Sequence, residues 1–304
     1  MKTSPLFSRA AFAVAAFFMA LNVARADVRL ASVFTDHMVL QRELPVPVWG
    51  WASPGEKIGV RFAGQARSTV AAADGQWRVD LAALAASADS RDLVVAGTNT
   101  LTLHDVLVGE VWLASGQSNM AFTVSKKAAS YAGVVDEEAE IAAANYPLVR
   151  MFMGKSAKSL APQTELGGQW QVCSPETVPA WSAVGYFFAR ELHQELKVPI
   201  GIVTVAFGAS CAQAWIRRDA MLGDPAFKAV LDRFDGLVSS YTPPTPEERK
   251  AQQEAAAKAR AAGQRAPAGR ADPVQDQHNP TVLYNGMVAP IVPYAFRGMI
   301  WYQG

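Results

Sequence analysis

The sequence predicts an α/β domain built on a parallel sheet, preceded by a small all-β domain that resembles a sandwich. Two observations lead to this fold class. Short apolar segments separated by turn residues recur over residues 27–107, which is the pattern of a small sandwich. From residue 108 onward, short apolar runs alternate with stretches of helical periodicity, which is the pattern of layered α/β proteins.

The first 26 residues have the composition of an export signal. Lys2 and Arg9 precede an apolar stretch over 10–23, and Ala24-Arg25-Ala26 places small residues where a signal peptidase reads them. The apolar stretch is shorter than the about 20 residues that a membrane span needs. We therefore expect cleavage after Ala26 rather than an uncleaved membrane anchor, and a periplasmic or secreted protein with no membrane segment after cleavage.

The charge and the cysteine content exclude several classes of function. Removal of the signal takes away three basic residues and no acidic one, so the net charge falls from +1 to −2. A nearly neutral chain has no electrostatic footprint for nucleic acid. The two cysteines, Cys173 and Cys211, are equally compatible with a disulfide in an oxidising compartment and with two free thiols. No cysteine and histidine cluster has the spacing of zinc ligands, so we expect no metal site.

The sequence pattern of residues 27–107 predicts the small all-β domain. Several of its apolar runs alternate apolar with polar residues, as half-buried strands do. Turn residues separate them at Ser53-Pro54-Gly55, Asp74-Gly75 and Gly97-Thr98-Asn99. A structural packing role is favoured for this domain over a carbohydrate-binding role. The predicted strands cover 46–49, 58–62, 77–81, 93–95 and 101–103.

Residues 108–304 predict the α/β domain. Its first strand, 111–114, is a short apolar run of the kind that a buried parallel strand shows. A biased segment at about 243–275, rich in Ala, Gln, Lys and Arg, predicts an exposed helix and a loose connector. A solvated surface insertion is favoured there over a nucleic-acid arm. The other predicted elements are strands at 149–153, 200–207 and 299–302 and a helix at 183–196.

Ser118 is the main candidate for chemistry. It follows the predicted strand 111–114 within Gly116-Gln117-Ser118-Asn119, and α/β sheets bind ligands beyond the carboxyl ends of their strands. Backbone N–H groups at a following helix start would stabilise the oxyanion formed in ester hydrolysis. On spacing alone, a Ser-Asn pair after a strand is more often a helix cap or a turn. Met120 also departs from the Gly-x-Ser-x-Gly motif of the α/β-hydrolases.

The segment from Gly109 to Met120 resembles the nucleophile block of the sialate O-acetylesterases, which belong to the SGNH/GDSL superfamily of serine esterases. Several long blocks in the same order are much more specific than one serine motif. The resemblance spans nearly the whole chain after the signal and implies an SGNH-hydrolase-like parallel sheet with flanking helices. The other matching blocks lie at 34–41, 179–192, 198–215 and 283–304.

The resemblance implies a serine mechanism without a metal or an organic cofactor. A histidine oriented by an aspartate deprotonates Ser118, which forms an acetyl-enzyme that water then hydrolyses. The N–H groups of Ser118 and Gly208 and an asparagine side chain would form the oxyanion hole. The family usually has Trp-Gly-Gly where this chain has Phe207-Gly208-Ala209, and alanine takes a positive φ less easily than glycine. A tight turn is the alternative role of Gly208.

The resemblance also implies residues beyond Gly304. The family continues from there into Glu-Ser-Asn and, much later, into an Asp-x-x-His block. We therefore expect an N-terminal portion, an incomplete esterase domain, that is essentially inactive by itself and whose last strand leaves an exposed edge. None of the four histidines is expected to replace the missing base; they are His37, His104, His193 and His278.

The expected substrate is sialic acid or another sugar that carries O-acetyl groups. The alternatives are an esterase for acetylated plant polysaccharide, such as acetylated xylan, and a non-catalytic glycan-binding protein. Aromatic residues near the motif would stack on a sugar ring, although such residues more often belong to the core. The expected substrate-binding residues are Gln117, Asn119 and Gln303, and the aromatic candidates are Trp215, Trp301 and Tyr302.

Overall fold

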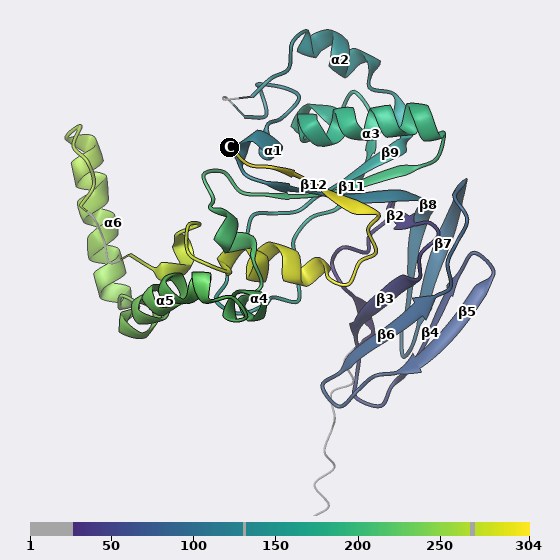
Figure 1. The fold of residues 1–304 in the computed structure, drawn as a ribbon, viewed down its shortest axis with the longest axis horizontal. Coiled ribbons are helices and arrows are strands. Elements are labelled where there is room, and N and C mark those ends of the chain that lie inside the picture. Colours follow the sequence, from purple (N-terminus) through teal and green to yellow (C-terminus); the bar gives the residue numbers. More distant parts are fainter. Residues whose placement is uncertain (1–26, 130–131, 268–270) are drawn as a thin grey trace, which may run out of the picture.

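The computed structural model describes residues 27–129, 132–267 and 271–304. The expected signal peptide, residues 1–26, lies outside the described residues. The architecture is mixed α/β, with a large mixed sheet flanked by helices and a β-rich region at its N-terminal side (Figure 1), which confirms the predicted fold class. In the described part of the chain, no helix is both long and apolar enough to cross a membrane.

The β-rich region consists of two facing groups of strands. One is a three-stranded antiparallel sheet in the order β1-β3-β6, and the other forms the first part of the large sheet in the order β8-β7-β4-β5. Exposed and buried residues alternate along β6, which is the pattern that predicted this strand. The bounds are β1 Arg29–Leu30, β3 Val46–Trp51, β4 Lys57–Phe62, β5 Gln65–Val70, β6 Gln76–Leu81 and β7 Ser87–Ala96.

A single long strand, β8 (Thr100–Gly116), joins the β-rich region to the α/β sheet. Its first part pairs antiparallel with β7, and its second part pairs in parallel with three other strands. The pairing with β7 is irregular where Asp105 adopts a left-handed backbone with φ 57°; such an irregularity bends a strand. The segments predicted as separate strands at 101–103 and 111–114 are therefore one continuous strand.

The α/β part of the sheet has the order β10-β9-β11-β8, with β12 on the other side of β8. The pairs β9–β11, β11–β8 and β8–β12 are parallel, and β10 is antiparallel to β9. Buried residues fill β11 almost completely, as expected for a strand covered on both faces. The bounds are β2 Val39–Gln41, β9 Tyr146–Met153, β10 Trp170–Cys173, β11 Ile200–Ala206 and β12 Gly298–Tyr302.

Two cores cover the two faces of this sheet. Helix α3 (Ala183–Leu196) packs on β9 and β11 and buries Trp181, Tyr186 and Met151 with the residues around them. On the opposite face, one continuous apolar cluster extends from the β-rich region to Val203 and Met287. The β-rich region and the α/β sheet thus share a core.

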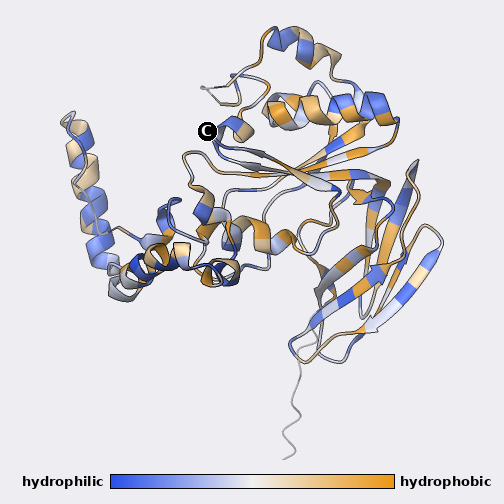
Figure 2. Ribbon diagram, in the orientation of Figure 1, coloured by the Kyte–Doolittle hydropathy of each residue, from blue (hydrophilic) through white to orange (hydrophobic). Residues whose placement is uncertain are grey.

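The remaining helices lie outside the sheet, and α6 (Pro246–Ala261) projects away from the rest of the protein (Figures 1 and 2). Thr245 and Glu248 form a capping box at its start, and α6 has no buried residue. The other elements are α1 Ser118–Ala121, α2 Glu137–Ala143, α4 Arg218–Leu222, α5 Lys228–Ser240 and the short helices η1 Val178–Ala180, η2 Ala212–Trp215, η3 Pro225–Phe227, η4 Pro273–Gln275, η5 Tyr284–Val288 and η6 Ala289–Ile291.

Both cysteines are free thiols in the structure. Cys173 is buried and Cys211 is partly exposed. Burial raises the pKa of the Cys173 thiol to about 11, because the charged thiolate is disfavoured away from water. Of the two possibilities that the sequence left open, the structure has the unpaired one.

Candidate functional site

The carboxyl ends of three parallel strands meet at Gly116. This residue is opposite Ala206 of β11 on one side and Tyr302 of β12 on the other. Its φ of +136° is a conformation that favours glycine, and a Cβ atom at this position would lie 2.1 Å from the backbone oxygen of Tyr302. The sequence Gly116-Gln117-Ser118 therefore leaves the sheet at the edge where α/β proteins bind ligands.

Backbone hydrogen bonds tie the residues around Ser118 to both neighbouring strands. The Gln117 N–H donates to the Tyr302 oxygen at 3.1 Å, and the Phe207 N–H donates to the Gly116 oxygen at 3.1 Å. The Gln117 oxygen accepts from Met120 and Ala121, both at 3.0 Å, and so begins the short helix α1. Ser118 is consequently held at a defined point between the ends of β11 and β12.

Ser118 is the first residue of α1 and is partly exposed. Among the described residues, its hydroxyl makes no hydrogen bond. Its own N–H comes before the first hydrogen bonds of α1, as the first N–H groups of any helix do. The structure thus presents a hydroxyl and a nearby backbone donor at the same edge of the sheet.

Gly208 lies beside Ser118. A Cβ atom built on Gly208 would be 3.7 Å from the Ser118 Cβ, which is an ordinary contact distance, and Gly208 itself is exposed. The two turns that follow β8 and β11 therefore approach each other without being sealed from solvent. This is the arrangement that an oxyanion site between their N–H groups requires.

Side-chain hydrogen bonds stabilise the turn that follows β11. Ala209 has a φ of 53°, so this alanine adopts the left-handed conformation that glycine takes more easily. The buried Ser210 hydroxyl accepts a hydrogen bond from Trp215 Nε1 at 3.0 Å, and the Ser210 oxygen accepts one from Gln303 Nε2 at 2.6 Å. These contacts hold the turn in place with an alanine in the left-handed conformation.

Helix α1 is supported by the start of α3. The Ser182 hydroxyl donates to the backbone oxygen of Met120 at 2.6 Å and accepts from the Gly185 N–H at 3.1 Å, so it caps α3 and holds α1 together. The Ala183 N–H also donates to the Phe122 oxygen at 2.7 Å. Ser182 was not predicted to support the site, although a serine before an apolar helical segment is a recognisable helix cap.

The three residues expected to bind substrate lie near Ser118, and two of them already make side-chain hydrogen bonds within the protein. Gln117 donates from its side chain to the backbone oxygen of Gly304. Asn119 is partly exposed in α1. Gln303 uses its amide nitrogen to hold Ser210, whereas its buried Oε1 has no partner among the described residues. Gln303 therefore links β12 to the turn that contains Gly208.

The three aromatic candidates lie at or next to the end of β12. The rings of Trp215 and Trp301 meet edge to face with their centroids 5.9 Å apart. Trp215 is buried, whereas Trp301 and Tyr302 are 40% and 46% exposed. Trp215 thus packs in the core and donates a hydrogen bond to Ser210. The two aromatic residues of β12 remain accessible to a ligand.

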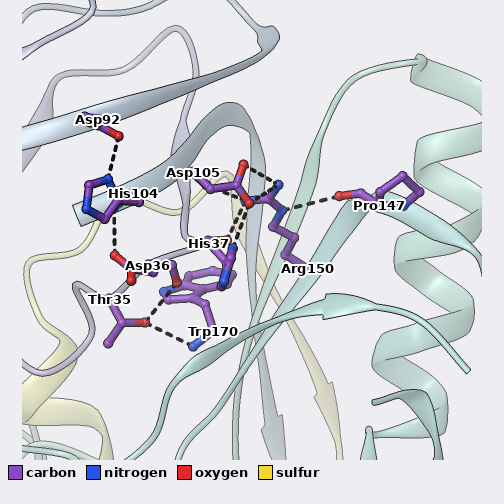
Figure 3. A network of polar contacts seen from close by, with 9 residues as sticks. All are labelled: Thr35, Asp36, His37, Asp92, His104, Asp105, Pro147, Arg150 and Trp170. Atoms are coloured by element: carbon purple, nitrogen blue, oxygen red, sulfur yellow. Dashed lines mark hydrogen bonds and ion pairs between the residues drawn. The ribbon is translucent and has the colours of Figure 1, made fainter. Parts of the chain in front are cut away.

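Two of the four histidines lie in a polar network at the opposite end of β8 (Figure 3). His37 Nδ1 is 2.7 Å from Asp105 Oδ2, and the Arg150 guanidinium contacts the same carboxylate at 2.9 Å. His104 contacts Asp92 at 2.9 Å. Asp105 and Gly116 are eleven positions apart along β8, which corresponds to roughly 36 Å of strand. Neither histidine is within reach of Ser118.

The pKa values in this network follow from its contacts. Burial by itself would raise the pKa of Asp105, but hydrogen bonds from His37 and Arg150 together lower it below its usual value. The hydrogen bond and the charge of Asp92 raise the pKa of His104. The network is a charged connection between the β-rich region and β9.

The other two histidines also have partners other than Ser118. His193 Nδ1 lies 2.8 Å from the backbone oxygen of Val198, at the end where the chain enters β11. His278 Nδ1 lies 2.6 Å from Asp276 Oδ1. Over residues 27–129, 132–267 and 271–304, the structure contains no group of three or more Cys, His, Asp and Glu side chains arranged to hold a metal ion.

Comparison with known proteins identifies relatives of this chain. Residues 108–242 match the family described as "Carbohydrate esterase, sialic acid-specific acetylesterase". The sialate O-acetylesterase of Mus musculus is 29% identical over 311 residues, which cover 91% of this chain and 51% of the mouse protein. The Homo sapiens sialate O-acetylesterase is 26% identical over 299 residues, which cover 91% of this chain and 48% of the human protein.

A solved structure extends the similarity to the fold. A carbohydrate acetylesterase from Xanthomonas citri superposes with a TM-score of 0.68 at 35% sequence identity, covering 91% of this chain and 51% of that protein. The chain spans about half the length of each of these relatives. The matched region includes both the turn with Ser118 and the turn with Gly208.

Proposed function

We propose that this chain, which belongs to the sialate O-acetylesterase family of carbohydrate esterases, carries the nucleophile of a serine esterase that removes O-acetyl groups from sugars. The observation that carries the proposal is the position of Ser118 beside Gly208. A partly exposed hydroxyl follows the central parallel strand directly, and a second exposed turn lies at contact distance from it. An acetyl group bound between the two turns would meet a nucleophile and backbone N–H donors together.

The proposed chemistry has two steps. Ser118 Oγ attacks the acetyl carbonyl while a general base takes its proton. The base then returns this proton to the sugar oxygen, which leaves the tetrahedral intermediate as a hydroxyl. Water then hydrolyses the acetyl-serine and releases acetate. The N–H groups of Ser118 and Gly208 stabilise the oxyanion in both steps.

The general base is the part of this mechanism that the four histidines do not supply. A base must come within about 3 Å of the serine hydroxyl, directly or through one water. His37, His104 and His193 lie toward the other end of the strands. His278 contacts Asp276, and it does not contact Ser118, whose hydroxyl makes no hydrogen bond among the described residues. We therefore propose that the chain by itself turns over esters slowly, at a rate lower than that of a complete triad by about 10⁴-fold or more.

The proposed substrate is an O-acetylated sugar of the sialic acid type. The relatives named sialate O-acetylesterase and the name of the family favour it. Acetylated plant polysaccharide is the second candidate, because the Xanthomonas citri relative is named more broadly as a carbohydrate acetylesterase. Trp301 and Tyr302, which are accessible at the end of β12, would contact the sugar in either case. Acetate release from O-acetyl sialic acid and from acetylated xylan distinguishes the two.

Covalent labelling tests the nucleophile without requiring turnover. The chain is incubated with a fluorophosphonate in buffered imidazole, which supplies an external base, and the modified peptide is identified by mass spectrometry. Labelling is expected at Ser118, and it should disappear in Ser118→Ala. Ser240→Ala, which changes a helix-end serine of α5 whose hydroxyl bonds only to its own helix, should keep the label. Modification spread over other serines, with Ser118 unmodified, would rule out the proposed nucleophile.

A further inference from the structure

A groove of about 390 Å³ separates the β-rich region from the α/β part of the protein. Strands β3 and β6 form one wall of the groove, and the other wall is formed by residues 163–164, 289–290 and 292–293. This volume is within the range of small-molecule sites. The mechanism proposed for Ser118 does not use this groove.

The groove is lined by tryptophan and by uncharged polar groups. Trp49, Trp51 and Trp77 are among its lining residues, together with Gln76, Gln163 and Thr164. The amide nitrogens of Gln76 and Gln163 donate within the protein, so their amide oxygens and the Thr164 hydroxyl are the polar groups left for a ligand. Trp49 and Trp51 belong to β3, where they are opposite Arg78 and Gln76 of β6. Flat aromatic surfaces beside amide and hydroxyl groups match the two kinds of surface on a sugar, the apolar C–H face and the hydroxyl edge.

Trp51 is a fixed and accessible ring within this groove. It is partly exposed, and the Arg29 guanidinium lies 4.6 Å from the centre of its ring. Arg29 is in turn paired with Glu165 at 2.5 Å. The ring is therefore held from one side by contacts within the protein.

Trp77 borders the groove but does not direct its ring into it. In the register of β3 and β6, Trp51 is opposite Gln76 and Trp49 is opposite Arg78, whereas Trp77 is opposite Gly50. Successive side chains of a strand point to opposite faces, so the Trp77 ring, which is 3% exposed, packs in the core. Trp51 is therefore the accessible ring of the groove.

The charges around the groove are already paired. Arg78 contacts Asp80 at 2.8 Å, and Arg29 contacts Glu165. The groove therefore offers no free guanidinium to a carboxylate. This pairing favours an uncharged ligand over an acidic sugar.

From these observations we infer that the groove binds a neutral oligosaccharide, at a site separate from Ser118. The separation follows from the sheet. Tyr294, next to the groove residue Pro293, donates its hydroxyl to the oxygen of Val39, and Val39 is opposite Leu107 of β8. Leu107 and Gly116 are nine positions apart along β8, which corresponds to roughly 30 Å. The groove would hold a glycan at one end of the protein while Ser118 acts at the other.

Binding measurements on the whole chain test this site independently of catalysis. Xylohexaose and cellohexaose are titrated into Ser118→Ala by calorimetry, with 3′-sialyllactose as the charged probe. Trp51→Ala should raise the dissociation constant of a neutral hexasaccharide at least about 10-fold, as loss of a central aromatic contact does. Thr164→Trp, which fills the groove from an exposed loop residue, should have the same effect without touching the core. Leu237→Ala, which shortens an exposed side chain of α5 outside the groove, should leave the dissociation constant unchanged. Trp301→Ala reports whether a hexasaccharide binds beside Ser118 instead.

The outcomes separate this inference from the esterase proposal, because Ser118 is already replaced. The inference is overturned if neither hexasaccharide binds, if only 3′-sialyllactose binds, or if Trp301→Ala abolishes binding while Thr164→Trp does not. Loss of binding in Thr164→Trp, with an unchanged melting temperature, supports it even if Trp51→Ala fails to fold.

Discussion

The Ser182 hydroxyl lies 2.6 Å from the backbone oxygen of Met120 and joins the start of α3 to the helix that begins with Ser118. Sixty-two residues separate the two partners in sequence, and both are buried. The position of the candidate nucleophile thus depends on a side chain from a different element.

Replacement of Ser182 should therefore affect both stability and the reactivity of Ser118. Ser182→Ala removes a helix cap and leaves the Met120 oxygen without its donor, which should lower the free energy of unfolding by about 1–3 kcal/mol. The rate of fluorophosphonate labelling at Ser118 should fall as well. Ser182→Thr keeps a hydroxyl and should restore most of the labelling. Asp224→Ala removes the remote cap of η3 and serves as control; an equal loss of labelling there would contradict the positioning role.

The left-handed backbone at Ala209 predicts how substitutions at this position change stability. Ala209→Gly removes the steric cost of a φ of 53°, so the free energy of unfolding should rise by up to about 1 kcal/mol. Ala209→Val should lower it, because a β-branched side chain fits this conformation poorly. Urea denaturation measures both changes. Ala220→Gly in α4 is the matched control and should lower the free energy of unfolding by about 1 kcal/mol. If Ala209→Gly lowered the free energy of unfolding as Ala220→Gly does, the backbone at Ala209 would not be strained.

Gly116 should not tolerate a side chain. A Cβ atom there would lie 2.1 Å from the Tyr302 backbone oxygen, and φ is +136°. Gly116→Ala should therefore displace β12 or the Ser118 turn and lower the free energy of unfolding by about 2 kcal/mol or more. Gly236→Ala in α5 meets nothing within 4 Å and should instead stabilise the helix by about 1 kcal/mol. Thermal unfolding of the two variants measures these opposite changes; a Gly116→Ala variant as stable as the wild type would contradict the prediction.

The network around Asp105 predicts a pH dependence of stability. The pKa of Asp105 is lowered in the folded protein, where His37 and Arg150 contact its carboxylate. A lowered folded pKa stabilises the protein above the unfolded pKa of about 4, and this contribution disappears as the pH falls through the folded pKa. The stability difference between wild type and Asp105→Asn should therefore be complete at about pH 6 and shrink progressively as the pH falls below the unfolded pKa of about 4 and through the lowered folded pKa. A difference that grows on acidification would have the wrong sign.

Arg150 is the buried cation of that network, and its side chain is 5% exposed. It donates to the backbone oxygen of His37 at 3.0 Å as well as to Asp105. Arg150→Ala leaves these acceptors unpaired at the joint between the β-rich region and β9, and it should cost about 3–5 kcal/mol. Arg91→Ala, which removes an exposed ion pair with Asp89, should cost less than about 1 kcal/mol. Chemical denaturation of the two variants compares a buried with an exposed arginine.

Local patterns in the sequence predicted much of this fold. The alternation along β6, the β-branched run of β11 and the apolar stripe of α3 all lie where periodicity placed them. The exposed helix α6 was predicted from composition and begins at a recognisable cap. The placement of Ser118 after a parallel strand follows from the same local reasoning.

What the sequence by itself determined, then, is the fold class and the local setting of Ser118, because strand and helix periodicity are properties of neighbouring residues. Only the tertiary structure decided that β8 is one strand, that Gly208 lies beside Ser118, that Ser182 holds α1 through Met120, and where the histidines lie. These features depend on strand register and on contacts between residues far apart in the chain. No local pattern encodes such contacts, because burial of a common core sets them.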